Sequence, residues 1–180
     1  MTVSSAAMAD IDKENLLYID LDYGRVTIEL FPKEAPLHVE QIKTLAREGF
    51  YDGIIWHRVI EGFMAQTGDP TGTGAGGSKL SNVKAEFNDL SFERGVVGAA
   101  RSASPNSANS QFFICLDDAT FLNGQYTVWG KVVDGMKYVD MIEKGEPPAN
   151  PDKMIKVSIA ADVKEEAKVD PEDKAAATGQ

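Results

Sequence analysis

Residues 54–70, IIWHRVIEGFMAQTGDP, combine a fixed cation, an apolar pair and one amide within a short stretch. The isoleucine and valine residues predict a buried strand, yet Arg58 lies inside it. A guanidinium does not lose its charge in a protein, and burying it without a partner is costly. Phe63, Met64 and Gln66 follow after a short turn. The stretch therefore needs a reason for placing charge, apolar surface and an amide so close together.

Two later blocks, ARSASPNSANSQFFICL at 100–116 and FLNGQYTVWG at 121–130, add residues of the same kinds. The candidates among them are one amide and four apolar or aromatic side chains: Gln111, Phe113, Phe121, Leu122 and Tyr126. With the first stretch, these side chains could form an apolar pocket with few polar groups. From the residues alone, a second interpretation is equally well supported. In it, Arg58 forms a salt bridge and the aromatic rings belong only to the core.

The segment GTGAGG, residues 72–77, matches the dinucleotide-binding pattern G-x-G-x-x-G letter for letter. That mechanism needs a strand before the glycines and a helix after them, so that the helix N-terminus meets the pyrophosphate. Here TGDP precedes the segment and SKLSNVKAEFND follows it, without an apolar helical stripe. The segment is therefore predicted to be a surface loop.

The histidine and cysteine residues do not support a metal site or a hydrolase active site. The two histidines, His38 and His57, have no second ligand at metal-binding spacing, and the single Cys115 lies in an apolar run. A Ser-His-Asp hydrolase is disfavoured because no nucleophile-elbow sequence is present. The sequence predicts no metal and no cofactor, with Cys115 as a small core residue and His57 as a packed or hydrogen-bonding side chain.

The amino-acid composition excludes some classes of binding partner and indicates the cellular compartment. Eighteen basic against 28 acidic residues give a net charge of −10, which argues against binding nucleic acid or an anionic membrane. The N-terminus lacks the features of a signal peptide, and no stretch is long and apolar enough to span a bilayer. A single cysteine fits a reducing compartment, so a cytoplasmic location is expected.

Strand signals outnumber helix signals along the chain. LLYIDLDYGRVTIELF, at 16–31, predicts a hairpin with its turn at 22–24, and short strands are predicted within 54–60, 95–100, 110–116, 126–133 and 155–160. Helices are predicted over 35–49, with a stripe of Val39, Ile42, Leu45 and Ala46, and over 134–145, with Asp134 as N-cap.

These elements predict a mainly β fold, a closed antiparallel eight-stranded β-barrel capped by two α-helices. Residues 15–162 would form this domain, between a flexible segment at 1–14 and an acidic, disordered tail at 163–180. Within the strand at 54–60, alternation predicts Trp56, Arg58 and Ile60 on one face, with His57 and Val59 on the other.

Three blocks in collinear order resemble the signature regions of the cyclophilins, the peptidyl-prolyl cis/trans isomerases. They are FYDGIIWHRVIEGFMAQTGDPTGTGAGG, PNSANSQFFICLDD and FLNGQYTVWGKVVDGM, and the resemblance runs from about Leu16 to Asp162. It implies that Arg58 is the catalytic arginine. It also implies a proline pocket and a surface for the substrate backbone, formed by Phe63, Met64, Gln66, Ala100, Arg101, Gln111, Phe113 and Leu122.

The chain departs from many eukaryotic cyclophilins at the rim of this site. Phe121 stands where they have a tryptophan that hydrogen-bonds cyclosporin, Tyr126 replaces a histidine, and Arg101 replaces an asparagine. The pattern is more similar to bacterial cyclophilins. Trp56, where phenylalanine is usual, is expected to change only local packing. The resemblance thus implies reduced affinity for cyclosporin, with catalysis retained.

The resemblance also implies a mechanism without a cofactor, in which Arg58 stabilises the twisted amide of an X–Pro bond. The implied partners are proline-containing peptides and unfolded proteins, bound by a monomer. Two alternatives stay open on the residues: a non-catalytic module that binds proline peptides, and a barrel that carries a small molecule. Arg58 argues against the first, because binding alone needs no donor aimed at the prolyl nitrogen. The match of FMAQ and SQFFICL to a surface groove argues against the second.

Overall fold

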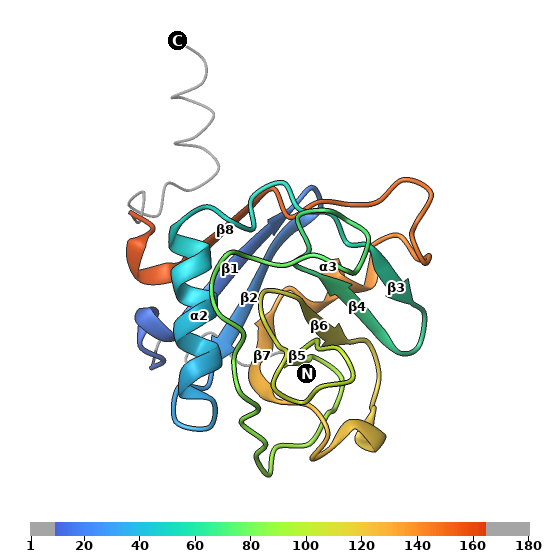
Figure 1. Ribbon diagram of the computed structural model, residues 1–180. Coiled ribbons are helices and arrows are strands. Elements are labelled where there is room, and N and C mark those ends of the chain that lie inside the picture. Colours follow the sequence, from blue (N-terminus) through green and yellow to red (C-terminus); the bar gives the residue numbers. More distant parts are fainter. Residues whose placement is uncertain (1–9, 165–180) are drawn as a thin grey trace.

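Eight short strands, rich in β-branched and aromatic residues, pair into one antiparallel sheet in the computed structural model, which describes residues 10–164 (Figure 1). The strand order is β3-β4-β6-β5-β7-β2-β1-β8. The strands are β1 (Leu16–Leu21), β2 (Gly24–Leu30), β3 (Arg58–Ile60), β4 (Met64–Thr67), β5 (Val96–Ala99), β6 (Phe112–Cys115), β7 (Val128–Asp134) and β8 (Lys156–Ile159). The mainly β class is confirmed.

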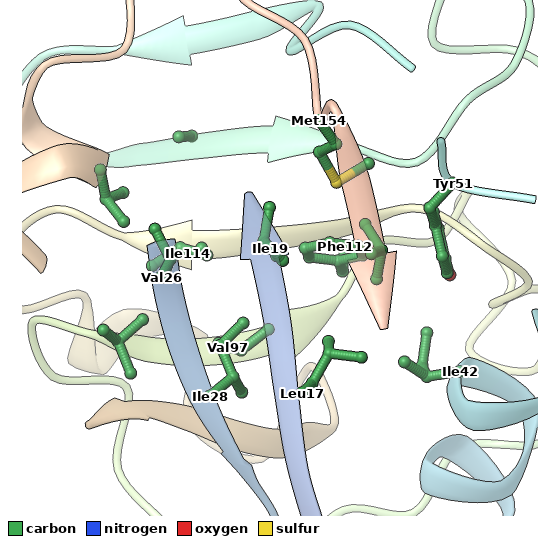
Figure 2. Packing of buried hydrophobic residues seen from close by; sticks show 14 of the residues in the cluster. Leu17, Ile19, Val26, Ile28, Ile42, Tyr51, Val97, Phe112, Ile114 and Met154 are labelled. Carbon is green, nitrogen blue, oxygen red and sulfur yellow. The ribbon is translucent and has the colours of Figure 1, made fainter. Parts of the chain in front are cut away.

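The predicted N-terminal hairpin is present. Strands β1 and β2 pair from Leu16 opposite Glu29 to Leu21 opposite Gly24, which leaves a two-residue turn. Alternation along both strands sends one set of side chains into a buried cluster. Figure 2 shows this cluster on what we call the inner face of the sheet, where side chains from β1, β2, β5, β6 and α2 meet.

Helix α2 (Pro36–Arg47) covers part of this core and packs against β8. Its first turn donates from the N–H groups of Leu37 and His38 to the carboxylate of Glu86, at 3.1 and 2.8 Å. A carboxylate at a helix N-terminus is favourable because the first N–H groups have no partner within the helix. The predicted stripe of Val39, Ile42, Leu45 and Ala46 is buried, so this helix is confirmed.

Helix α3 (Met136–Asp140) is only five residues long, shorter than the predicted span of 134–145. Asp134 is not its N-cap, because it pairs with Thr27 as the last residue of β7. Gly135 takes the N-cap position instead. The short helix still packs one side into the core, since Met136 and Val139 are buried.

The predicted closure of the barrel is wrong. The sheet is an open, curled half-barrel, because the end strands β3 and β8 do not pair with each other within residues 10–164. Single bridges, Ile55 to Lys153 and Val59 to Gly145, connect the region of β3 to residues that precede β8. Prolines interrupt this intervening stretch at 147, 148 and 151, and a proline has no N–H to continue a ladder.

Alternation also fails at Trp56, because β3 begins only at Arg58. Trp56 is fully buried on the inner face, in the same cluster as Val59, and its ring meets that of Phe112 edge-on with the centroids 6.3 Å apart. The backbone before Arg58 is irregular, so a period of two does not extend back to this residue.

The predicted terminal segments lie mostly outside the described residues, which exclude 1–9 and 165–180. Short 3-10 helices stand near both boundaries, at Lys13–Asn15 and Ala160–Asp162, with a third at Thr120–Leu122. Glu14 and Asp162 both pair with Arg47 of α2. Across residues 10–164, none of the helices has the length and apolar character needed to cross a bilayer.

Candidate active site

Four residues form a row across the sheet on the face opposite the inner core, which we call the outer face. The register places Arg58 of β3 opposite Gln66 of β4, Gln66 opposite Phe113 of β6, and Phe113 opposite Gly98 of β5. Residues directly opposite in a ladder point to the same face of the sheet. The pairing therefore brings together a cation, an amide and an aromatic ring from separate parts of the sequence.

A second apolar cluster supports this row. Its buried members are Met64, Phe92, Val96, Phe113, Cys115, Ala119 and Val128. The ring of Phe113 stacks on Phe92 at 5.6 Å and meets Tyr126 edge-on at 5.9 Å. A Cβ at Gly98 would lie 2.6 Å from the Phe92 ring and 2.7 Å from the Phe113 ring, so only glycine lets both rings lie against β5. The aromatic wall of the pocket is thus packed in place.

A cavity of about 100 Å³ opens beside this wall. It is lined by nine of the eleven predicted site residues: Arg58, Phe63, Met64, Gln66, Ala100, Arg101, Phe113, Leu122 and Tyr126. Gln111 lies next to it, in the wall of an adjoining polar cavity of about 460 Å³ that shares Ala100 and Arg101. Phe121 stands outside both cavities, 70% exposed, with its ring 5.6 Å from Phe63.

Arg58 reaches the mouth of the smaller cavity with two polar contacts. Its Nε donates to Oε1 of Glu146 at 3.0 Å, and its Nη1 donates to Oε1 of Gln66 at 3.5 Å. The side chain is 45% exposed, so the charge inside an apolar sequence pattern is both solvated and paired. The salt bridge considered as an alternative does exist, but it lies at the pocket instead of in the core.

The two glutamines form a relay with a defined direction. Gln111 Nε2 donates to the carbonyl oxygens of Gly74 and Gly76 at 2.9 and 2.8 Å, and Gln66 Nε2 donates to Gln111 Oε1 at 2.9 Å. A carbonyl can only accept, so the loop determines which way the Gln111 amide is turned. Gln111 in turn orients Gln66, whose oxygen is left facing Arg58.

The loop that starts this relay is wrapped around the carboxylate of Asp69. The carboxylate accepts from the N–H groups of Thr71, Thr73, Gly74 and Gly76 at 2.8, 3.1, 2.6 and 3.1 Å. Burial alone would raise the pKa of Asp69, but hydrogen bonds from Thr71, Gly76 and Gly74 outweigh it and lower the pKa to about 2. The prediction that GTGAGG is a loop is confirmed.

Arg101 and Tyr126 close the other side of the cavity. The Arg101 guanidinium lies over the Tyr126 ring, 4.5 Å from its centroid, and its Nε donates to the Gln125 carbonyl at 3.1 Å. The N–H of Ala100 donates to the Gln111 carbonyl at 3.0 Å, which extends the pairing of β5 and β6 up to the site. Arg101 therefore holds a wall of the pocket through its side chain.

Cysteine and histidine take no part in lining this cavity. Cys115 is fully buried, and burial raises the pKa of its thiol to about 12. His57 is buried behind the site, and desolvation lowers its pKa, which favours the neutral ring. His38, in the first turn of α2, pairs with Glu86 at 2.6 Å. These are core positions, as the sequence indicated for Cys115.

Sequence reasoning missed Glu146, Asp69 and Gly98. An aspartate just before a glycine-rich segment is a recognisable turn signal, so Asp69 could have been found. Glu146 carried no such signal, because 88 residues separate it from Arg58 and only the tertiary pairing brings the two together.

Comparison with known proteins agrees with this geometry. Residues 16–161 match the family model described as cyclophilin type peptidyl-prolyl cis-trans isomerase/CLD. A probable peptidyl-prolyl cis-trans isomerase of Brucella suis is 52% identical over 178 residues, covering 90% of each chain. A peptidyl-prolyl cis-trans isomerase of Schizosaccharomyces pombe is 40% identical over 141 residues, covering 74% of this chain and 91% of that protein.

Solved structures give the same assignment. A cyclophilin from Hirschia baltica superposes with a TM-score of 0.81 at 28% identity, covering 92% of this chain and 84% of that one. A cyclophilin type isomerase of Cryptosporidium parvum, crystallised in the presence of the dipeptide Ala-Pro, superposes with a TM-score of 0.74 at 31% identity. The overlap there is 80% of this chain and 98% of that one. The chain therefore belongs to the cyclophilin-type peptidyl-prolyl cis-trans isomerases, enzymes that catalyse rotation about the peptide bond preceding proline.

Proposed function

We propose that this enzyme rotates X–Pro bonds in unfolded or flexible protein segments by a non-covalent mechanism in which Arg58 stabilises the twisted amide. The observation that carries the proposal is the position of Arg58. Its guanidinium stands at the mouth of a small apolar cavity and is oriented by two side-chain acceptors.

The chemistry follows from the nature of the amide bond. Conjugation of the nitrogen lone pair with the carbonyl gives a rotational barrier of about 20 kcal/mol. Turning the bond out of plane frees the lone pair, and Arg58 can then donate a hydrogen bond to the pyramidal nitrogen. The planar ground state offers a poor acceptor, so the interaction forms mainly in the transition state and accelerates rotation. Lowering the barrier by roughly 7 kcal/mol would raise the rate by about five powers of ten.

The cavity is suited to hold the proline ring while the bond rotates. At about 100 Å³ it is smaller than the 300–1,000 Å³ of typical drug-sized ligand pockets, and it is walled by Phe63, Met64, Phe113 and Leu122. One proline ring is a fitting occupant, while Gln66 and the main chain at Ala100 and Arg101 hold the flanking peptide. One side of the bond can then turn against a fixed other side. The Ala-Pro dipeptide used with the Cryptosporidium parvum relative supports this choice of ligand.

The two rival functions are less well supported. A carrier of a small molecule is disfavoured because the sheet is not a closed barrel and this cavity, about 100 Å³, is smaller than typical ligand pockets. A module that only binds proline peptides would not need a guanidinium oriented by two acceptors at the edge of the pocket. Catalysis on a short X–Pro peptide separates the proposal from both rivals.

The proposal also covers the client proteins, the oligomeric state, the compartment and the binding of cyclosporin. The clients are unfolded proteins, which fits an enzyme that assists folding. A monomer in a reducing, cytoplasmic compartment fits the single buried thiol of Cys115. Cyclosporin would bind with reduced affinity, because Phe121 offers no donor at the rim.

The test is NMR exchange spectroscopy on a proline peptide with the Arg58→Ala and Arg58→Lys variants. Loss of one donor aimed at the transition state typically costs about a hundredfold or more, so Arg58→Ala should lose most activity while remaining folded. Arg58→Lys should also be poor, since an ammonium lacks the planar fork of donors.

Arg47→Ala is the matched control, because Arg47 is 40% exposed, is also paired with a carboxylate and does not line the cavity. Its activity should equal that of the unaltered protein. Full activity in Arg58→Lys or Arg58→Ala would overturn the proposed role of Arg58.

A further inference from the structure

Glu146 stands directly across from Arg58 on the free edge of β3. Val59 and Gly145 exchange both backbone hydrogen bonds, each at 2.8 Å, in an antiparallel bridge. The next pair outward is then Arg58 with Glu146. In antiparallel geometry this is a non-hydrogen-bonded pair, where facing side chains approach most closely. The row of Arg58, Gln66, Phe113 and Gly98 on the outer face therefore continues past Arg58 to Glu146.

Glycine and proline restrict the backbone of the segment that carries Glu146. Gly145 has a φ of 148°, and a Cβ there would lie 2.5 Å from the Cα of Pro148, so the turn requires glycine. The pyrrolidine rings of Pro147 and Pro148 limit the backbone further. Farther along, Asn150 donates its N–H to the carboxylate of Glu143 at 2.6 Å. Glu146 is thus presented to Arg58 by a constrained backbone.

This ion pair contributes little to the free energy of unfolding. Its side chains are 45% and 57% exposed, and exposed pairs are screened by water and lose side-chain entropy when they form. Its effect on Arg58 is larger. An arginine side chain has many rotamers, and two acceptors, 3.0 Å from Nε and 3.5 Å from Nη1, favour the orientation seen here. Neither contact uses Nη2, which can therefore serve a ligand.

We propose that Glu146 is a positioning residue for Arg58, which rests on the proposed catalytic role of that arginine. Glu146 lies outside the residues that line the cavity, so it acts on the guanidinium and not on the substrate. The carboxylate on one side and the glutamine relay on the other hold the donor before the peptide arrives. Preorganised donors lower the barrier because nothing has to reorient during the reaction.

The experiment compares Glu146→Ala and Glu146→Gln by steady-state isomerisation of a short X–Pro peptide. Misplacing a donor slows the chemical step, so Glu146→Ala should lower kcat by about tenfold with KM unchanged. Glu146→Gln keeps an acceptor oxygen and should recover most of that loss. The melting temperature should not change in either variant. Asp162→Asn removes a similarly exposed arginine partner, that of Arg47, and should leave kcat unchanged.

A double-mutant cycle separates this inference from the proposed function. With Arg58→Ala as background, Glu146→Ala should have no further effect, because the residue acts through the guanidinium. If Arg58→Ala is inactive while Glu146→Ala keeps full or raised kcat, positioning by Glu146 is excluded and the role of Arg58 stands. A change in KM alone would likewise overturn the inference, by indicating a direct contact with the peptide. Full activity of Arg58→Ala would instead remove the proposed function on which the inference rests.

Discussion

A charged side chain in an apolar strand is accommodated here because the outer face at β3 is open to solvent. Arg58 is half exposed and has carboxylate and amide acceptors, so its charge is never buried alone. Arg101 is used differently. Its guanidinium stacks on Tyr126, which turns a departure from the eukaryotic pattern into part of the pocket wall.

Phe121 gives a residue-scale prediction about inhibitor binding. Its ring is 70% exposed at the rim, next to Phe63, and offers apolar surface without a donor. Phe121→Trp should add a hydrogen bond and ring contact to cyclosporin, tightening binding by about tenfold, or roughly 1.4 kcal/mol. Calorimetric titration of cyclosporin into both forms measures the difference.

Activity on a short proline peptide should barely change in Phe121→Trp, because the rim lies outside the cavity. Phe87→Trp is a suitable control, since Phe87 is also exposed and lines neither cavity of the site. Equal cyclosporin affinities for the Phe121→Trp and unaltered forms would refute the assignment of Phe121 to the inhibitor contact.

The loop from Asp69 to Gly77 shows how an irregular element can still be well defined. Its N–H groups converge on one carboxylate, and its carbonyl groups point to Gln111. The glycine content that resembles a phosphate-binding pattern serves this close wrapping. The strands then complete the site, since their register alone aligns Gln66 with Arg58 and Phe113.

Asp69→Asn tests the loop as an element. An amide offers one acceptor oxygen, and its NH2 would face backbone N–H groups, so buried donors would lose their partner. We expect the free energy of unfolding to fall by about 1–3 kcal/mol. Activity should fall too, because the carbonyls that orient Gln111 would shift. Urea denaturation and a peptide assay measure the two effects. Asp89→Asn, at an exposed position, is the control, and unchanged stability in Asp69→Asn would contradict this account of the loop.

At the scale of the molecule, one sheet separates the two larger apolar clusters. The inner face carries the larger core with α2, and the outer face carries the smaller cluster beneath the pocket (Figures 1 and 2). Residues 112 to 115 alternate between the two, so a single strand contributes to both. Because β3 and β8 stay unpaired with each other, the edge of β3 is available for the segment that carries Glu146.

Buried histidine predicts how the stability of the whole molecule depends on pH. Desolvation lowers the pKa of His57 below its ordinary value of 6.5, so the unfolded chain takes up a proton first as the pH falls. Stability is then fully present above about pH 6.5 and is lost as the pH falls toward the folded pKa of His57. Asp69 adds a second loss between about pH 4 and 2, because its pKa is lowered to about 2.

Urea midpoints measured from pH 7.5 downward test this dependence. His57→Asn removes one titrating group, so the urea midpoint should depend less steeply on pH near pH 6. Part of the dependence should persist because burial also lowers the pKa of His38. A midpoint that stays constant from pH 7.5 to pH 5 would contradict the buried, neutral state of His57.

The sequence by itself determined the family, every strand except β4 and most of the side chains that meet at the pocket. Ordered blocks such as HRVI, GFMAQTGD and SQFF carry local patterns, and alternation or helical spacing is encoded in neighbouring residues. Nine of the eleven residues that the resemblance implied for the site line one cavity. Burial of the stripe on α2 follows from the same local periodicity.

Only the tertiary structure decided what depends on distant segments meeting. The open edges of the sheet, the inward turn of Trp56 and the start of α3 only after Asp134 all result from backbone pairing that local patterns do not encode. The same holds for Glu146, which reaches Arg58 because Gly145 pairs with Val59 across a long stretch of chain. A residue's type limits the partners it can have, but the register of the sheet determines which partner it meets.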